Sequence, residues 1–167
     1  MRDLVVDENT VYDSVTLQLD LNSGTFSILD ATLKDTSFPA SALDTFSKNG
    51  LKIDFFGCNL SGNTQITCLT KIVASNQNLE IKAFAKDDSR ISQLFDDLSN
   101  EYGASTVTAL DMAESTFLDF TLIKGIPVEV KFIYNNIDPS ATSISLFEPL
   151  FQNEFTFIEG SFTNIDF

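Results

Sequence analysis

The sequence contains no histidine and no tryptophan, and it has only three tyrosines. Histidine is the side chain that most often exchanges protons or binds metals near neutral pH, so its absence disfavours most catalytic and metal-binding functions. Glycan-binding surfaces favour tryptophan and tyrosine, whose rings also form hydrogen bonds. We therefore expect no catalytic residue, no metal ligand and no cofactor.

Cysteine is also scarce, because the chain has only Cys58 and Cys68. Two cysteines are too few for a disulfide framework or for a zinc site with four cysteine ligands. We expect two reduced, partly buried thiols in a cytosolic chain, and a disulfide across a hairpin is the alternative.

Basic residues and long apolar runs are in short supply as well. The chain has 24 acidic residues against 10 basic ones, a formal net charge of −14, which argues against direct binding to nucleic-acid phosphates. No window approaches the roughly 18 apolar residues of a membrane span, and the first residues lack the apolar core of a signal peptide. We expect a protein of the virion or the cytoplasm that is not secreted by a signal peptide and does not bind membranes.

The motifs of common enzyme mechanisms are absent too. There is no Gly-x-Ser-x-Gly nucleophile elbow, no phosphate-binding loop and no dinucleotide fingerprint. Asp13, Asp35 and Asp44 each precede a Ser or Thr, but not the glycine that completes an aspartic dyad. A carboxylate pair acting on a sugar and calcium bound at residues 20–24 or 87–89 remain open. Our main expectation is that the chain is not an enzyme and has no small-molecule substrate.

The chain does contain enough apolar material for one well-packed domain. Hydrophobic residues make up 43% of its 167 residues, and 16 residues are phenylalanine. A chain of this length buries roughly two-thirds of its unfolded surface. Residues 1–167 are therefore expected to form a single β-rich domain.

Apolar and polar residues alternate with period two along most of the chain, which is typical of β-strands. Examples are the segments 15–21, 51–55, 79–83 and 128–134, with turn-forming residues between them. We expect about nine short strands in a mainly β fold, either an antiparallel β-sandwich or a small barrel.

Two segments depart from this alternation and predict helices. Over 89–102, apolar residues recur at helical spacing, so one amphipathic α-helix is expected there. Its apolar positions are Ile91, Leu94, Phe95, Leu98 and Tyr102. A capping Ser41 and a terminating Asn49-Gly50 pair indicate a second, short helix over 41–48.

The few basic residues are unevenly placed. Residues 48–86 hold five lysines and two acids, whereas 1–47 hold 8 acids and 2 bases and 87–167 hold 14 acids and 3 bases. The five are Lys48, Lys52, Lys71, Lys82 and Lys86. One hypothesis is a basic sheet region that meets an acidic region of the next copy, head to tail, in a ring or filament. The alternative is that these lysines pair with acids on neighbouring strands or protect an edge strand from aggregation.

Two further groups are candidate contact residues. Asp96, Asp97 and Glu101 would share the polar face of the helix expected at 89–102. Phenylalanine is dense near the end of the chain, where Phe155, Phe157 and Phe162 either close the core in a pinned strand or dock into a neighbouring molecule.

These features favour a non-enzymatic structural or assembly subunit of a virus or bacteriophage particle, of the tail, connector or decoration type. Its partners would be further copies of itself or other assembly subunits. The alternative is an acidic inhibitor that mimics nucleic acid and binds a basic groove of a host protein through Asp96, Asp97 and Glu101. A calcium-dependent or glycan-binding module is a weaker alternative.

Overall fold

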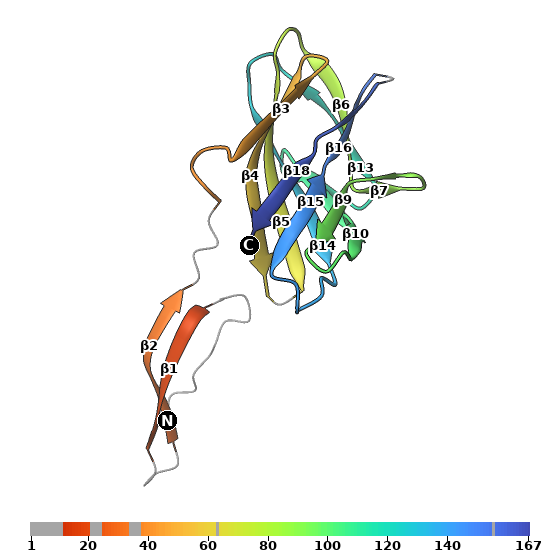
Figure 1. The fold of residues 1–167 in the computed structure, drawn as a ribbon. Coiled ribbons are helices and arrows are strands. Elements are labelled where there is room, and N and C mark those ends of the chain that lie inside the picture. Colours follow the sequence, from red (N-terminus) through yellow and green to blue (C-terminus); the bar gives the residue numbers. More distant parts are fainter. Residues whose placement is uncertain (1–11, 21–24, 34–37, 63, 155) are drawn as a thin grey trace. The chain divides into compact units, whose positions relative to one another are not determined.

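The computed structural model describes residues 12–20, 25–33, 38–62, 64–154 and 156–167. The chain divides into two compact units, residues 1–37 and residues 38–167 (Figure 1). In the first unit, β1 (Tyr12–Asp20) and β2 (Thr25–Leu33) pair antiparallel as a two-stranded sheet. This pairing confirms the strands that the alternation predicts there. Whether both units fold as one domain stays a prediction.

The second unit is mainly β and entirely antiparallel, and its described residues contain no helix and no closed barrel. Its largest sheet has six strands in the order β12-β11-β14-β5-β4-β3. These are β12 (Met112–Glu114), β11 (Thr106–Ala109), β14 (Val128–Asn135), β5 (Gln65–Ala74), β4 (Leu51–Ser61) and β3 (Asp44–Lys48). The strands are more numerous and shorter than the nine expected, because turns and bulges divide several of them.

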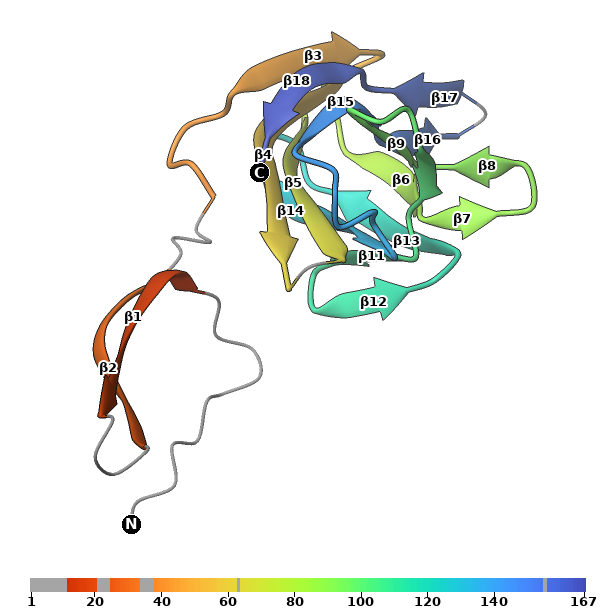
Figure 2. The ribbon, with the colours of Figure 1, turned by 60° about the horizontal axis from the view of Figure 1, so that its bottom comes forward.

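Two four-stranded sheets lie against this large sheet (Figures 1 and 2). The first is ordered β10-β9-β15-β18, with β10 (Glu101–Gly103), β9 (Gln93–Asp96), β15 (Ser143–Glu148) and β18 (Phe162–Asp166). The second is ordered β13-β6-β16-β17, with β13 (Phe117–Leu122), β6 (Leu79–Phe84), β16 (Leu150–Asn153) and β17 (Thr156–Glu159). A short pair, β7 (Lys86–Asp87) and β8 (Arg90–Ile91), completes the unit.

The two four-stranded sheets are continuous along their last strands. β15 runs into β16 across Pro149, which has no amide hydrogen to give to a ladder. The amide of Gly160, between β17 and β18, donates to the Pro149 carbonyl at 3.1 Å. This hydrogen bond holds the two long strands together where their regular pairing is interrupted.

Phenylalanine rings fill the space between the two layers. The ring centroid of Phe55 in β4 lies 4.7 Å from that of Phe162 in β18 and 5.4 Å from that of Phe147 in β15. Phe132 in β14 meets Phe147 and Phe151, each at 5.7 Å. All five side chains are buried. Rings without a polar atom suit such a core, since nothing in them needs a hydrogen-bond partner.

A bulge in β4 brings the two cysteines together. The register with β5 shifts between Phe55 and Cys58, where Gly57 has a φ of 103° that L side chains rarely adopt. Cys58 then lies opposite Cys68, and the two form a disulfide with their Cα atoms 4.0 Å apart. The expectation of two reduced thiols is therefore wrong, and the alternative, a disulfide across a hairpin, is found.

The helix expected over 89–102 is wrong, because that segment forms β8, β9 and β10. Alternate residues Ser92, Leu94 and Asp96 are buried, which is the period of a strand. The two polar members of this set have hydrogen-bond partners. The Ser92 hydroxyl donates to the Phe84 carbonyl at 2.6 Å and accepts the Leu150 amide at 2.9 Å. Tertiary hydrogen bonds thus override a helical spacing of apolar residues.

The short helix expected over 41–48 is also wrong. Residues Asp44–Lys48 form β3, which pairs with β4 from Asp44 opposite Phe55 to Lys48 opposite Leu51. The Asn49-Gly50 pair, which looked like a helix end, is instead the turn between these strands, with φ values of 52° and 79°. Such values at both positions favour a tight hairpin turn.

Candidate interaction surfaces

The β1–β2 sheet separates apolar from polar residues through its register. Tyr12 lies opposite Leu33, and three further apolar pairs follow along the sheet. Those pairs are Val15–Ala31, Leu17–Ile28 and Leu19–Phe26. Between them lie four polar pairs, Ser14–Thr32, Thr16–Asp30, Gln18–Ser27 and Asp20–Thr25. Apolar and polar pairs therefore alternate along the two strands, which is the pattern of a sheet with one apolar and one polar face.

Two irregularities in the strand pairing keep apolar residues opposite apolar ones and polar residues opposite polar ones. The register shifts between Tyr12 and Ser14, which leaves Asp13 without an opposite residue, and between Thr16 and Leu17, which leaves Leu29 without one. Each extra residue changes the phase of its strand by one position. Without the shift at Leu29, Ala31 and Leu33 would lie out of phase with the other apolar residues of β2. The two bulges therefore keep the alternation of pairs in phase, and we call the eight residues of the apolar pairs the β1–β2 apolar face.

A second apolar surface lies at one end of the 38–167 unit. The turn between β11 and β12 has Leu110 at φ 50° and Asp111 at φ 61°. A two-residue turn of this kind favours Asn-Gly, and a bulky L residue in the left-handed region costs about 1–2 kcal/mol. The strained Leu110 side chain is 54% exposed. Backbone strain of this kind persists only where the surrounding structure maintains it.

Other exposed aliphatic side chains surround this turn. Met112 follows it in β12, and Ile123 and Ile126 lie in the loop that leads into β14. The register places Ala109 opposite Val130 near the start of β14, so both loops are at the same end of the sheet. We call Leu110, Met112, Ile123 and Ile126 the apolar loop end.

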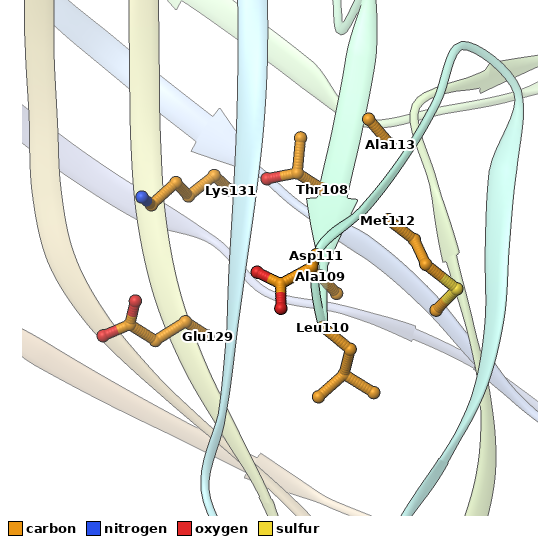
Figure 3. A pocket seen from close by; sticks show the side chains of 8 residues that line it. All are labelled: Thr108, Ala109, Leu110, Asp111, Met112, Ala113, Glu129 and Lys131. Atoms are coloured by element: carbon orange, nitrogen blue, oxygen red, sulfur yellow. The ribbon is translucent and has the colours of Figure 1, made fainter.

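An open pocket of about 340 Å³ lies beside the β11–β12 turn (Figure 3). Its lining residues are Thr108, Ala109, Leu110, Asp111, Met112, Ala113, Glu129 and Lys131. Leu110 comes from the turn and Met112 from the start of β12, whereas Glu129 and Lys131 come from β14. Substrate sites usually enclose their ligand and present a few convergent polar groups. The pocket beside the turn is open rather than enclosed.

The five lysines do not form one basic surface. Lys52 lies in β4 and Lys71 in β5 of the six-stranded sheet, whereas Lys82 and Lys86 belong to β6 and β7 of other sheets. Lys48 ends the edge strand β3 and is exposed. The five lysines lie within 39 successive positions of the sequence, but the structure distributes them over different sheets.

Three of these lysines pair with acids. Lys71 lies 3.1 Å from Glu129 on β14, and Lys82 lies 3.5 Å from Asp119 on β13. Both are cross-strand neighbours in register. These pairs match the alternative that the lysines balance acids on adjacent strands.

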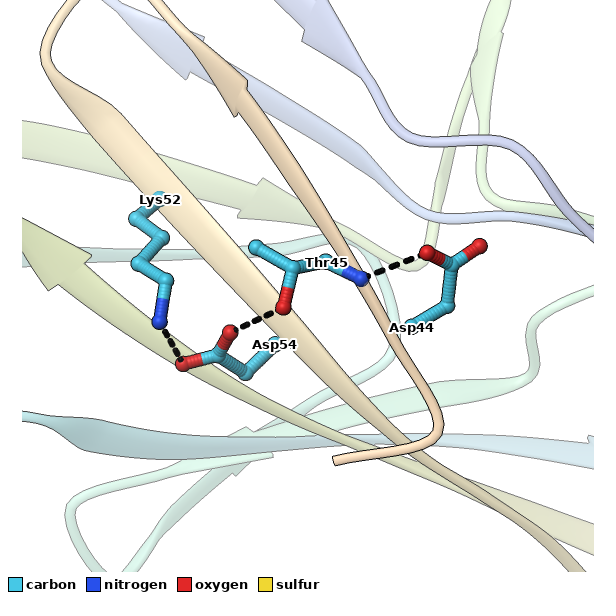
Figure 4. A network of polar contacts seen from close by, with 4 residues as sticks. All are labelled: Asp44, Thr45, Lys52 and Asp54. Carbon is cyan, nitrogen blue, oxygen red and sulfur yellow. Dashed lines mark hydrogen bonds and ion pairs between the residues drawn. The ribbon is translucent and has the colours of Figure 1, made fainter. Parts of the chain in front are cut away.

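Lys52 contributes to a polar network on β3 and β4 (Figure 4). Its amine lies 2.8 Å from the Asp54 carboxylate, to which the Thr45 hydroxyl donates at 2.6 Å. Burial acts to raise the pKa of Asp54, but the hydrogen bonds from Lys52 and Thr45 and the lysine charge outweigh it, so this pKa is lowered. Asp44 accepts the Thr45 amide at 2.7 Å. The network fixes the β3 edge.

The three acids expected on a helix face are not on one. Asp96 ends β9 with 1% of its surface exposed, whereas Asp97 and Glu101 are exposed on either side of the β9–β10 turn. The alternative of a nucleic-acid mimic depends on this helix face, and the structure has no helix there. Asp97 instead ties the turn to the loop residue that precedes β15, since it accepts the Thr142 hydroxyl at 2.7 Å.

Asp96 is the most constrained acid among the described residues, and sequence reasoning did not single it out as buried. Its carboxylate accepts the amides of Leu98 and Asn100 at 2.9 and 2.8 Å, and the Asn100 side chain and Tyr102 hydroxyl at 2.8 Å each. Burial acts to raise the pKa of Asp96, but these four hydrogen bonds outweigh it and lower the pKa. The local signal was Asp-Leu-Ser-Asn, whose residues favour side-chain-closed turns.

The phenylalanines near the end of the chain have different environments. Phe162 is 2% exposed and packs on Phe55 and Phe147, so the structure places it in the core. Phe157 is 44% exposed and lies 6.1 Å from Phe84 between ring centroids. Phe155 lies outside the described residues.

The remaining candidates for ligands find little support in the described part of the chain. No group of three or more metal-ligating side chains gathers there. Of the two calcium candidates, residues 21–24 lie outside the described residues, and in the other Asp87 pairs with Arg90. Within the same residues, no helix is both long and apolar enough to cross a bilayer.

Comparison with known proteins gives no family. No protein-family model matches the chain, and no curated protein matches it.

Proposed function

We propose that this chain is a non-enzymatic assembly subunit that acts by binding other copies of itself. The observation that carries the proposal is the β1–β2 apolar face, with four apolar pairs kept in phase by two bulges. A two-stranded sheet by itself is marginally stable in water at best. Such a sheet gains stability when a further surface covers its apolar face.

The charge of the chain restricts where copies can meet. A net charge of −14 makes most surfaces of two copies repel each other. The eight residues of the β1–β2 apolar face carry no formal charge. Contact at this face therefore avoids the repulsion that contact elsewhere would meet.

We also propose an architecture for the 38–167 unit and the kind of particle to which the chain belongs. We interpret the 38–167 unit as a β-sandwich, since one six-stranded sheet faces two joined four-stranded sheets. A β-sandwich that is joined in the chain to a further two-stranded sheet suits a repeated subunit of a particle. Membership of a virion or bacteriophage particle remains part of the proposal, because the same arrangement serves other assemblies.

The mass of the full chain in solution tests the proposal. Light scattering after gel filtration is expected to give an oligomer whose fraction rises with protein concentration. Salt separates the possible contacts. An apolar contact between acidic chains strengthens or stays constant as salt screens repulsion, whereas a head-to-tail contact between lysines and acids weakens. A monomer at all concentrations and at both low and high salt would refute self-assembly.

A further inference from the structure

We propose that the β13–β14 loop, residues 123–127, docks into a groove between β3 and β18 of a second copy, so that copies associate head to tail in a ring or filament. This inference rests on the proposed function, and it adds a contact between the 38–167 units of two copies. The loop, the groove and their exposure all belong to described residues.

The groove lies along one side of the 38–167 unit, where the six-stranded sheet ends at β3 and a four-stranded sheet ends at β18 (Figure 2). Its volume is about 360 Å³. Phe55 and Phe162, whose ring centroids lie 4.7 Å apart, both line it. Leu43 lines it as well and is 60% exposed, so an aliphatic side chain that entered the groove would also remove Leu43 from water.

Two acids line the same groove, Asp44 from β3 and Asp166 from β18. Among the described residues, neither carboxylate forms an ion pair. The Asp44 carboxylate accepts the amide of the adjacent Thr45, which leaves its charge unbalanced. A groove with apolar side chains and uncompensated negative charge favours an occupant that offers both aliphatic groups and a cation.

The β13–β14 loop has this combination. Ile123 and Ile126 are 55% and 52% exposed, and Lys124 between them is exposed. In the part of the chain that the structure describes, Lys124 forms no ion pair, and residues 121–128 contain no acid. In a chain with a net charge of −14, an acidic surface of another copy is therefore attracted to this loop, whereas most of the chain repels it.

Hydrogen bonds hold the loop in a defined shape before it meets a partner. The amide of Ile126 donates to the Ile123 carbonyl at 3.0 Å, which closes a four-residue turn. The amide of Lys124 donates to the side chain of Asn78 at 2.9 Å. A loop that is already ordered loses less conformational entropy on docking than a loose one.

The loop and the groove lie on different sides of the unit, so the contact joins unlike surfaces. β13 is the edge strand opposite β17 in its sheet, and β17 leads into β18 at the groove. In the other layer, β5 and β4 separate β14 from β3. Figure 2 shows β3 and β18 on one side of the unit and β13 on the other. Each copy therefore has its loop available to one neighbour and its groove to another.

The contact is small. Two half-exposed isoleucines and the stem of Lys124 bring roughly 200 Å² of apolar area to the groove. A standard interface buries about 800 Å² per partner, so one loop–groove contact is expected to be weak. Repetition along a ring or filament strengthens such contacts, because each copy is then held at two places.

Exchange of charge in the full chain tests the contact. Lys124→Glu makes the loop negative, and the double variant Asp44→Asn, Asp166→Lys makes the groove positive, so copies of either variant alone repel each other at the contact. In a one-to-one mixture, every loop finds a groove of opposite charge on the other variant. Sedimentation velocity at low salt should show association at least about fivefold weaker for each variant alone, and recovery in the mixture.

Lys86→Glu is the matched control, because it makes the same charge change at an exposed lysine of β7. It should leave the association constant within about threefold of the original chain. An effect as large as that of Lys124→Glu would overturn the proposal, since net charge alone would then explain both. Failure of the mixture to recover association would also overturn it.

The apolar part of the contact has its own pair of variants. Ile126→Asp should raise the dissociation constant at least about tenfold, because it carries a charge into the groove. Leu98→Asp makes the same change between β9 and β10 at a side chain of similar exposure, 49% against 52%, and should leave the constant within about threefold. Equal effects of the two variants would contradict docking through the loop.

Photo-cross-linking identifies what occupies the groove. A diazirine-bearing aliphatic analogue replaces Leu43, and ¹⁴N-labelled and ¹⁵N-labelled chains are mixed before illumination to distinguish links between copies from links within one. The expected products join position 43 of one copy to residues 110–126 of another. Products that join position 43 to residues 1–37, in the same or another copy, would show a different occupant and overturn the proposal.

The outcomes separate this inference from the proposed function. An oligomer whose mass is unchanged by the loop and groove variants overturns the loop–groove contact and leaves self-assembly intact. A chain that is monomeric at all concentrations and at both low and high salt overturns both.

Discussion

Replacement of Asp96 by alanine is expected to destabilise the 38–167 unit strongly. Four donors converge on this carboxylate, and the residue is 1% exposed. A hydrogen bond to a charged group contributes about 1.5–3 kcal/mol, and a donor left buried without a partner costs about 1–3 kcal/mol. Contributions within one network are not additive. We expect Asp96→Ala to lower the free energy of unfolding by about 3–5 kcal/mol.

A loss of this size is a large part of the 5–15 kcal/mol that typically stabilises a domain. Urea denaturation, followed by circular dichroism or tyrosine fluorescence, measures it directly. Asp96→Asn retains one acceptor oxygen and should lose less than Asp96→Ala. Asp97→Ala serves as the neighbouring control, because its carboxylate accepts three hydrogen bonds at an exposed site, and it should be the mildest of the three.

The stability lost on replacing Asp96 by asparagine should depend on pH. The pKa of Asp96 in the folded chain lies below its ordinary value of 3.8. A depressed carboxyl pKa stabilises the fold fully above the unfolded value and loses this effect as the pH falls through the folded pKa. The difference between the original chain and Asp96→Asn should stay constant from about pH 7 to pH 5 and shrink below about pH 4. A loss of less than about 1 kcal/mol in Asp96→Ala would refute the reasoning. A difference in unfolding free energy between the original chain and Asp96→Asn that does not change with pH would also refute it.

Three further predictions follow from single features of the 38–167 unit. Replacing Cys58 and Cys68 together by alanine should cost about 2–3 kcal/mol in urea denaturation, because the disulfide closes a loop over a sequence separation of 10; an unchanged midpoint would contradict this. The double variant Leu110→Asn, Asp111→Gly should raise the melting temperature in calorimetry by about 2–6 °C through relief of the strained turn, whereas a lower value would show that the Leu110 side chain supports the fold. Burial, followed by the charge of a nearby glutamate, raises the pKa of Glu148, so Glu148→Gln should stabilise the chain at pH 7 and lose this advantage near pH 4; equal gains at both pH values would exclude the titration as the cause.

Much of the strand structure could be predicted from alternation alone. In β14, Val128, Val130, Phe132 and Tyr134 are buried, as their period of two indicates. The alternating leucines of β1 likewise predict one of the two strands that form the candidate contact. Burial of apolar residues against a second layer makes this signal reliable wherever the strand is regular.

The bulges could not be predicted, since each one breaks the period that a pattern search depends on. At Leu29 the shift moves Ala31 and Leu33 back to the apolar face. The bulge at Gly57 brings Cys58 opposite Cys68, where the two form a disulfide. The number of cysteines alone favoured reduced thiols. The alternation of pairs in the β1–β2 sheet and the covalent link therefore emerge only from the observed register.

The helix over 89–102 failed for a different reason. Ser92 and Asp96 are polar residues at buried positions, and a pattern of hydrophobicity assigns such residues to the surface. Their hydrogen bonds come from segments distant in sequence, such as Leu150 for Ser92, or from a turn that the helix would have replaced. The conformation of this segment is therefore determined by the groups that hydrogen-bond to Ser92 and Asp96, and not by its own pattern of apolar residues.

The stacking of Phe55 on Phe162 bears on how the molecule acquires its structure. These rings come from strands more than one hundred positions apart, so a large loop must close before they meet. Folding is accordingly expected to take milliseconds to seconds, and a species in which β18 has not yet docked would display the Phe55 and Phe147 rings to solvent. Aggregation during refolding should therefore depend more on the arrival of this final strand than on the stability of the finished protein.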